Sequence, residues 1–314
     1  MQHRNTWKKM NKLKGPVGLF LCGGGALGSW QSGALARLVS GGVEFDAVAG
    51  FSVGALNGAG YCYNKTGEMR AIWAGLKPES MLSMRPGYNN MPLELYRHHG
   101  PGFFRTLGFL LQKHLSRMYL FSNKPLYTFL DSWLSKTGAK FSRDINFYVI
   151  SHSVETKLPY IVKFDGGTHS YNLSFVDSLV ASCAIPTIFP PIEVTERGST
   201  CHLVDGGVIG IANINLNIFE GCKTIVMIGN SREEDLDFPQ AGVLGYFESK
   251  ARRMLALHTR KIYESSIFIK SAPVVHYFKP PVDLDLGILE FNGAKCARAF
   301  DIGEREAEKW LSEG

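Results

Sequence analysis

Two glycine-rich segments, each closing a short apolar run, constrain this chain more than any other feature. The first follows the apolar run 17–22 and reads GGGALG, with its glycines at Gly23, Gly24, Gly25 and Gly28. The second follows the apolar run 47–49 and has the pattern G-x-S-x-G, formed by Gly50, Ser52 and Gly54. A strand, a sharp turn that carries a serine, and a helix form a nucleophile elbow, which exposes the serine hydroxyl at the helix N-terminus. The two segments together predict serine acyl hydrolysis on an α/β scaffold.

A serine hydroxyl is a poor nucleophile, so Ser52 needs a base that takes its proton. The tetrahedral intermediate of acyl transfer carries an oxyanion, which backbone N–H groups can stabilise. Gly23, Gly24 and Gly25 are suited to supply these groups, because a backbone without Cβ can approach a reacting carbonyl closely. We therefore expect the glycine segment to form an oxyanion loop beside Ser52.

The same glycines also match G-x-G-x-x-G, the pattern of a dinucleotide site. That interpretation requires an acidic residue about 20 positions further on, at the carboxyl end of the second strand, where it would bind a ribose. Asp46 has roughly this separation, but it precedes the run 47–49 and therefore lies at the wrong end of the strand. The pattern does not favour a nucleotide site here.

Two later blocks supply candidates for the base. Residues 181–191 read ASCAIPTIFPP, and residues 205–207 read DGG. With the glycine loop and G-x-S-x-G before them, in this order, the blocks resemble the patatin-like phospholipases. The resemblance implies a three-layer α/β/α fold with a central, mostly parallel sheet, and a Ser–Asp dyad without histidine or metal. It identifies Ser52 as the nucleophile and Asp205 as the general base. It also places Gly206 and Gly207 in the D-G-G motif, and implies no cofactor.

Two alternative bases deserve comparison with Asp205. Asp165 also begins a D-G-G sequence, but it ends an apolar run that we expect to pair as a hairpin with 148–151, and Asp-Gly there is typical of a turn. A Ser–His–Asp triad would use His258 or His276, which follow Asp205 in the chain. His258 falls in an expected basic helix over 245–263, where a solvent-facing position is the simpler interpretation. His276 alternates with apolar residues in an expected strand, where packing is simpler.

Strand signals alternate with helical ones along the chain, which favours a mostly parallel sheet covered on both faces. The expected strands are 17–22, 47–49, 147–151, 202–204, 224–228 and 274–278. Reactive residues should then lie at the carboxyl ends of strands. We expect one acyl hydrolase domain over 16–314, preceded by a basic tail over 1–15. The apolar and basic stretch at about 78–121 is expected to be an insertion, either a helical cap or an acyl-binding lid.

The net charge of +6 comes largely from five basic residues before position 15, without any acid among them. Elsewhere 29 basic residues (34 − 5) face 28 acidic ones, so a nucleic-acid partner is not expected. No run of about 18 apolar residues is present, so the sequence predicts no spanning helix. Six cysteines lack metal-ligand spacing, which indicates a reducing compartment and no zinc. The expected location is the cytoplasm with peripheral contact to a membrane; export as an effector stays open.

The expected activity is that of a lipid acyl hydrolase of the phospholipase A or lysophospholipase type, acting on lipid esters at a membrane or micelle surface. Two alternatives remain. A thioesterase or acyltransferase could use the same residues and pass the acyl group to a different acceptor. A membrane-binding module with a vestigial site would keep the motifs but not the turnover.

Overall fold

The structure, a computed structural model, describes residues 13–83, 119–134, 141, 144–165, 172–186, 188–196, 198–207, 214–237 and 242–313. Most of the expected tail and most of the expected insertion at 78–121 lie outside these residues. In the part that the structure describes, no helix is both long and apolar enough to cross a lipid bilayer.

Within the described residues, eight strands form one sheet in the order β5-β6-β3-β2-β1-β7-β8, and β4 pairs with β3 outside this path. The strands are β1 (Val17–Leu21), β2 (Ala47–Phe51), β3 (Asn146–Ser153), β4 (Pro159–Phe164), β5 (Ile192–Glu196), β6 (Ser199–Asp205), β7 (Thr224–Ile228) and β8 (Val274–Phe278). The five strands β3, β2, β1, β7 and β8 are parallel. Every residue of β1, β2 and β7 is buried, as expected of parallel strands that are covered on both faces.

The strand that ends at Asp205 belongs to the other, antiparallel part of the sheet. β4 and β6 both run antiparallel to β3, and β5 runs antiparallel to β6, so the sheet is mixed. β4 forms the hairpin expected from the sequence, because only residues 154–158 separate it from β3. β5 was not expected, although its sequence, IEVTE, alternates apolar and polar residues as a half-buried strand does.

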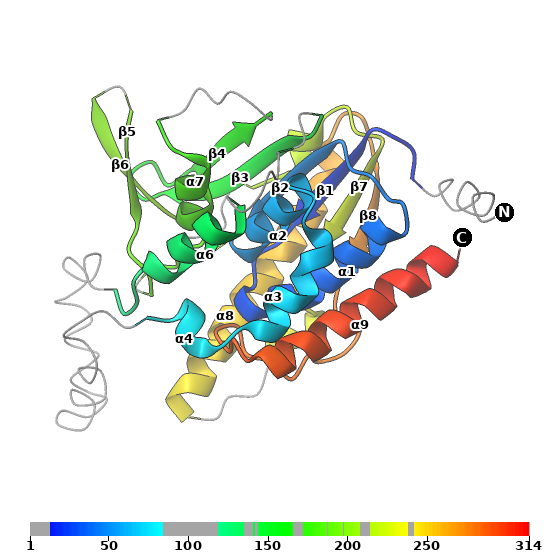
Figure 1. Cartoon of the computed structure of the whole chain (residues 1–314). Helices are drawn as coiled ribbons and strands as arrows, with labels where there is room; N and C mark the ends of the chain where they lie inside the picture. Colours follow the sequence, from blue (N-terminus) through cyan, green and yellow to red (C-terminus); the bar gives the residue numbers. More distant parts are fainter. Residues whose placement is uncertain are drawn as a thin grey trace.

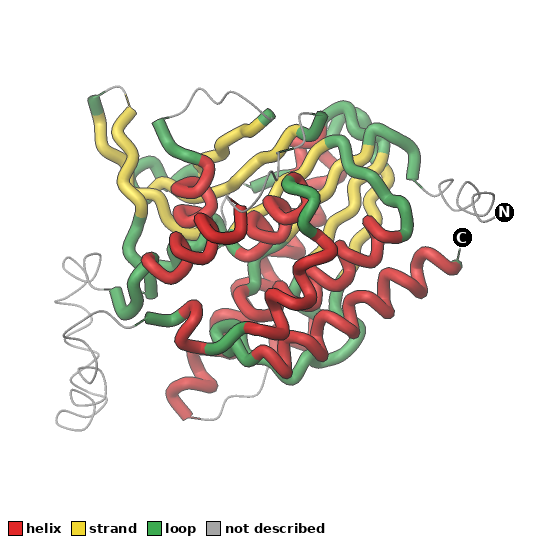
Figure 2. Tube along the Cα trace, viewed as in Figure 1, coloured by secondary structure: helices red, strands yellow, loops and turns green. Residues whose placement is uncertain are grey.

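The helices cover both faces of this sheet (Figures 1 and 2). They are α1 (Gly28–Ser40), α2 (Val53–Cys62), α3 (Met69–Gly75), α4 (Pro78–Met81), α6 (Lys124–Leu134), α7 (Phe175–Ser182), α8 (Gly242–Glu264) and α9 (Gly293–Ser312). Short 3₁₀ helices are η2 (Gly25–Leu27), η3 (Thr66–Glu68), η5 (Leu216–Phe219), η6 (Glu233–Asp237) and η7 (Ser265–Phe268). The three-layer arrangement expected from the sequence is confirmed.

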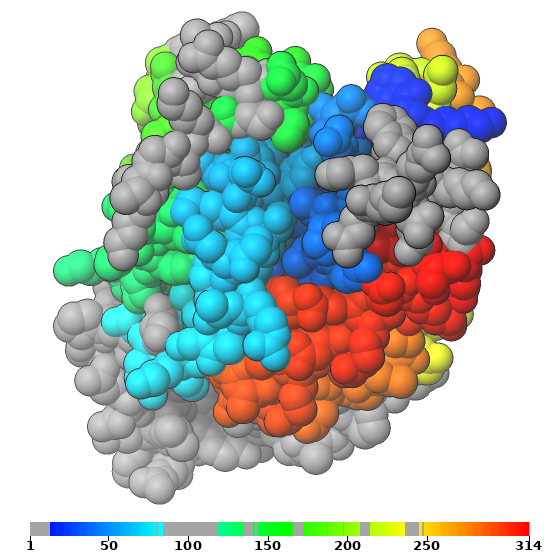
Figure 3. Space-filling model, turned by 45° about the vertical axis from the view of Figure 1, so that its right-hand side comes forward, coloured from blue at the N-terminus to red at the C-terminus, as the bar shows by residue number. Residues whose placement is uncertain are grey.

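Two apolar clusters form the core, one on each face of the sheet. The larger joins Leu19 and Leu21 of β1 to α1, α2 and α9, and the smaller joins Phe20 of β1 and Phe51 of β2 to Ile262 of α8. Elements from the two ends of the chain meet in the larger cluster, where α9 packs along α1 and α3 (Figure 3). The alternation of β1 side chains between two cores follows from the two-residue period of a strand.

Candidate active site

Ser52 lies directly after β2 and caps the N-terminus of α2, with φ 54 and ψ −135. A non-glycine residue at positive φ stores backbone strain, which is typical of the serine in a nucleophile elbow. Gly54 makes the turn possible, because a Cβ at this position would lie 2.1 Å from the carbonyl oxygen of Leu21 at the end of β1. The G-x-S-x-G segment therefore has the local geometry that its sequence predicts.

The end of α7 and the segment after it hold Ser52 and Asp205 through their backbones. The Ser52 N–H donates to the Ser182 hydroxyl at 2.8 Å and to the Ser182 carbonyl at 3.1 Å. The Ser182 hydroxyl in turn donates to the carbonyl of Ile150 in β3 at 2.6 Å. Two residues further on, the carbonyl of Ala184 accepts the Asp205 N–H at 2.9 Å. The block that carried the family resemblance thus connects the two candidate catalytic residues.

Asp205 comes beside Ser52 through the register of β3. Along one edge of β3, Phe51 of β2 pairs with Ile150, and Asp205 of β6 pairs with Ser151, the next residue. β4 pairs with both of these β3 residues as well, and therefore occupies the opposite edge. β2 and β6 consequently run towards each other along the same edge of β3, and their carboxyl ends meet. This head-to-head meeting brings the serine and the carboxylate together.

The Asp205 carboxylate is buried, and nearby donors partly compensate its loss of contact with water. Its side chain accepts the Gly207 N–H at 2.7 Å. Burial raises the pKa of Asp205 to about 6, and the Ser52 hydroxyl and the Gly207 N–H oppose this shift. A carboxylate in direct contact with a serine hydroxyl and with a pKa near working pH can act as a general base. Gly207 serves this site through its N–H, and Gly206 packs against the carbonyl of Ile150.

The raised pKa of Asp205 predicts a pH-dependent turnover. The carboxyl must be ionised to take the Ser52 proton, so kcat/KM should fall about tenfold for each pH unit below 6 and level off above it. A rate profile on a soluble p-nitrophenyl ester between about pH 4.5 and about pH 8 measures this. A rate that stays nearly level down to about pH 4.5, as a carboxyl with the ordinary aspartate value of 3.8 would give, would contradict the prediction.

The glycine segment follows β1 and presents unused N–H groups. Gly24 has φ 155 and Gly25 has φ 55, conformations that L-residues with a side chain rarely adopt. The Gly23 carbonyl accepts from the Asn230 side chain at 3.0 Å, and the Gly24 carbonyl accepts the Leu27 N–H at 3.1 Å. No hydrogen bond between described residues uses the N–H of Gly24 or Gly25. With its carbonyls occupied and these two donors unused, the loop can receive an oxyanion.

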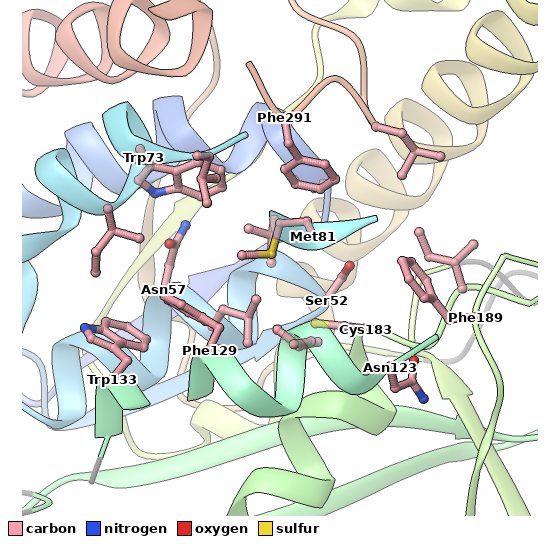
Figure 4. Close-up of a pocket in the computed structure, with 18 of the residues that line it drawn as sticks. Ser52, Asn57, Trp73, Met81, Asn123, Phe129, Trp133, Cys183, Phe189 and Phe291 are labelled. Atoms are coloured by element: carbon pink, nitrogen blue, oxygen red, sulfur yellow. The ribbon is translucent and has the colours of Figure 1, made fainter. Parts of the chain in front are cut away.

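An apolar pocket of about 110 Å³ opens beside Ser52. Ser52 lies towards one side of it with Phe189 and Asn123, while Trp73 and Trp133 lie on the other side (Figure 4). Besides these, the lining residues are Gly25, Val53, Leu56, Asn57, Met69, Ile72, Leu76, Met81, Leu126, Phe129, Cys183, Ile185, Leu289 and Phe291. Such a lining suits a hydrocarbon chain attached to the group that Ser52 would attack.

The rival residues from the sequence lie elsewhere or are poorly suited to act as a base. Asp46 accepts the Val17 N–H at 2.6 Å at the start of β1, away from the glycine loop. Asp165 is exposed at the end of β4, and Gly166 and Gly167 lie outside the described residues. Cys183 lines the pocket, but burial, reinforced by the Asp205 carboxylate, raises the pKa of its thiol well above the ordinary value.

Both candidate histidines serve packing. His276 lies in β8, as expected, with its ring 5.3 Å from that of Trp310. The expectation of a solvent-facing His258 is wrong: the residue is buried on α8, with its ring 5.3 Å from that of Phe51. Burial, then Lys261 and His152, lower the pKa of His258 to about 4, which makes its imidazole a weak base. Of the basic residues that suggested exposure, Lys250, Arg253, Arg260 and Lys261 are exposed, whereas Arg252 is buried like His258.

Replacing His258 therefore separates the dyad from a triad. His258→Ala should retain turnover within about tenfold, equivalent to about 1.4 kcal/mol of barrier, and should lower thermal stability because it leaves a cavity against Phe51. Initial rates, together with a melting curve, measure both effects. A loss of about a thousandfold in a protein that still melts cooperatively would indicate a histidine base.

Sequence reasoning missed several residues that shape this site. Asn230 donates to the carbonyls of Cys22 and Gly23, each at 3.0 Å, and Gln31 donates to the Cys22 carbonyl at 3.0 Å. Asn57, which lines the pocket, donates to the Gln31 side chain at 2.9 Å. The available signal was a buried amide in an apolar helix, as in Gln31 and Asn57, but its partners could not be inferred.

Comparison with known proteins agrees with this geometry. The family model described as Patatin-like phospholipase matches residues 19–219, which include the end of β1, the elbow and Asp205. The chain belongs to the patatin-like phospholipase family. This patatin-like chain is 23% identical over 319 aligned positions to the mouse (Mus musculus) and rat (Rattus norvegicus) proteins named patatin-like phospholipase domain-containing protein 7. The alignments cover 95% of the chain and 21% of each relative, so the chain spans about a fifth of their length.

Among solved structures, this patatin-like chain is similar to VipD from Legionella pneumophila. The TM-score is 0.47 at 15% sequence identity, and the match covers 96% of the chain and 68% of VipD. Family membership supports lipid acyl hydrolase activity in general terms.

Proposed function

We propose that this protein is a serine lipid acyl hydrolase of the phospholipase A or lysophospholipase type, with Ser52 as nucleophile and Asp205 as general base. The observation that carries the proposal is the meeting of β2 and β6 at their carboxyl ends, which brings Ser52 beside the buried Asp205 carboxylate next to an apolar pocket. A serine held against a base with a pKa of about 6 is suited to attack an ester near neutral pH.

In the acylation step, the Ser52 oxygen attacks the ester carbonyl carbon while its proton passes to Asp205. The carbonyl oxygen becomes an oxyanion, which accepts hydrogen bonds from the N–H groups of Gly24 and Gly25. The positive end of the α2 dipole, at which Ser52 lies, also favours this negative charge. The intermediate then collapses: the ester bond breaks, Asp205 returns its proton to the leaving alcohol, and an acyl-Ser52 ester remains.

Water completes the cycle by the reverse chemistry. Asp205 takes a proton from a water molecule, and the resulting hydroxide attacks the acyl-Ser52 carbonyl. The same oxyanion loop stabilises the second tetrahedral intermediate. Collapse releases a fatty acid and returns the proton to Ser52. Every step uses groups of this chain and water.

A lipid panel with product mass analysis tests the proposal. Wild-type protein should release free fatty acid from phospholipid or lysophospholipid, and Ser52→Ala should not. Release of the acyl group from a thioester, or its appearance on an added alcohol instead of water, would favour the thioesterase or acyltransferase alternative. Lipid binding without turnover in the wild type would favour a membrane-binding module with a vestigial site.

The surface on which the substrate resides forms a second part of the proposal. Lipid esters are held in membranes or micelles, and an apolar pocket of this kind would receive one acyl chain drawn from such a surface. We propose peripheral contact with a membrane or micelle, made by the single domain over 16–314 with its insertion at about 78–121. A rise in turnover above the critical micelle concentration of a short-chain phospholipid would support this contact; a smooth hyperbola through that concentration would oppose it.

A further inference from the structure

The loop between β8 and α9 lies directly against the glycine loop. The Ala26 N–H, next after Gly25, donates to the carbonyl of Ile288 at 2.7 Å. A Cβ on Gly25 would lie only 2.1 Å from the same carbonyl oxygen. The place of the Ile288 carbonyl therefore determines where the backbone of Gly25 and Ala26 can lie.

Two charged side chains of α8 hold this part of the loop from the other side. Glu248 accepts the Ile288 N–H, with its two oxygens at 3.0 and 3.2 Å. Arg252 donates through Nη2 to the carbonyl of Leu286 at 2.5 Å, and through Nε to Glu248 at 2.8 Å. The ion pair of Glu248 and Arg252 thus makes hydrogen bonds to the backbone at Leu286 and Ile288, on either side of Gly287.

Arg252 is a buried cation with an exposed fraction of only 4%. Its Nη1 lies 3.4 Å from Asp235, which is 2% exposed and accepts the Arg232 N–H at 2.7 Å. Burying such a cluster gains little stability, since apolar side chains of equal volume often do as well. The guanidinium and carboxylate provide what apolar side chains lack, namely directional hydrogen bonds to chosen backbone groups.

We propose that Glu248 and Arg252 are positioning residues for the oxyanion loop, acting through the Ile288 carbonyl on Ala26 and Gly25. The inference rests on the function proposed above. Neither side chain lines the pocket. Both bind the loop between β8 and α9, which contributes Leu289 and Phe291 to the pocket wall. If these hydrogen bonds are lost and the glycine loop moves by about 1 Å, the N–H groups of Gly24 and Gly25 no longer point at the position of the oxyanion. Such a displacement can cost about a hundredfold in rate.

Helix α8 supplies a matched control in its own sequence. Arg260 donates through Nε to Glu264 at 2.8 Å, with the same four-residue spacing and the same distance as the pair of Glu248 and Arg252. The control pair is exposed, and no hydrogen bond that the structure describes joins it to the loop before α9. Glu264→Ala therefore removes an ion pair of the same kind from the same helix without touching the loop.

The experiment compares Glu248→Ala, Glu248→Gln and Glu264→Ala on p-nitrophenyl acetate and on a long-chain p-nitrophenyl ester. Glu248→Ala should lower kcat about 10- to 100-fold on both esters, because displaced oxyanion donors slow both reactions. A defect of the pocket wall formed by Leu289 and Phe291 would instead act on the long acyl chain. Glu248→Gln keeps an acceptor for the Ile288 N–H and should restore most of the rate. Glu264→Ala should stay within about twofold of wild type. Unchanged kcat in folded Glu248→Ala, or a loss confined to the long-chain ester, overturns the proposal.

Hydrogen exchange gives a readout that does not depend on turnover. In Glu248→Ala, the amide of Ala26 should exchange at least about tenfold faster than in wild type, and in Glu264→Ala it should not change. If the wild type shows no Ser52-dependent turnover, the proposed function fails, and this measurement alone decides the inference. Unaltered protection of Ala26 in Glu248→Ala would show that the pair does not hold the loop.

Discussion

Ser52→Ala and Asp205→Asn are each expected to lose turnover by about a thousandfold or more, equivalent to at least about 4 kcal/mol of barrier. The first removes the nucleophile, and the second keeps the shape of the side chain but cannot take the Ser52 proton. Asp165→Asn is the matched control: it makes the same change in the other D-G-G sequence, at an exposed residue, and should retain wild-type rates. Steady-state rates on a soluble ester measure all three. Loss in Asp165→Asn with activity in Asp205→Asn would reverse the assignment.

Asp205→Asn should also be more stable than wild type at neutral pH, which separates lost catalysis from lost folding. The folded-state pKa of Asp205 is raised from 3.8 to about 6 because burial disfavours the charged form. The stabilisation from the protonated carboxyl is complete below pH 3.8 and is lost as pH rises through 6. The variant escapes this loss, which amounts to about 3 kcal/mol. Its advantage in melting temperature should therefore grow between about pH 4 and about pH 7.5.

Gly25→Ala is expected to lower kcat by about a hundredfold or more, the scale of losing one oxyanion donor. The new Cβ would lie 2.1 Å from the Ile288 carbonyl oxygen, at a residue with φ 55, so the loop must shift. Gly42→Ala controls for backbone strain alone, because Gly42 has φ 88 but no atom within 4 Å of the added Cβ.

Both variants should lose about 1 kcal/mol of folding stability from the positive φ, and only Gly25→Ala should lose rate. Denaturant unfolding and initial rates, measured on the same preparations, test the pair. A similar loss of rate in both variants would mean that activity follows general stability instead of the position of the glycine loop.

Several parts of this protein could be read from the sequence because their signals are local. The buried runs of β1, β2 and β7 are continuous and apolar, and a parallel strand covered on both faces needs such a run. The turn at Ser52 depends on residues within two positions of it, since Gly54 must pass close to β1. The order of the motifs was enough to indicate the family, and the family model that matches 19–219 confirms it.

The tertiary structure decided the features that depend on distant residues. Asp205 was expected at the carboxyl end of a strand in a mostly parallel sheet. The structure places it there, but β6 runs antiparallel to β3 and meets β2 head to head along it. Strand direction follows from chain connection and pairing, which no single apolar run encodes. His258 shows the same limit: a helix dense in basic residues still has one buried side, and which side faces the sheet depends on packing.

Hydrogen-bond partners that lie far apart along the chain could not be predicted from the sequence either. Ser182 lies 130 residues from Ser52 along the chain, and its hydroxyl accepts a hydrogen bond from the Ser52 N–H. Asn230 lies 207 residues from Gly23 and donates to its carbonyl. Serine and asparagine are common in turns and helix caps, so their sequence context does not distinguish a local bond from a long-range one. The sequence by itself determined the candidate nucleophile, its elbow and the strands of the parallel core. Only the fold, by bringing these distant polar groups together, decided how the candidate base and the glycine loop are held in place.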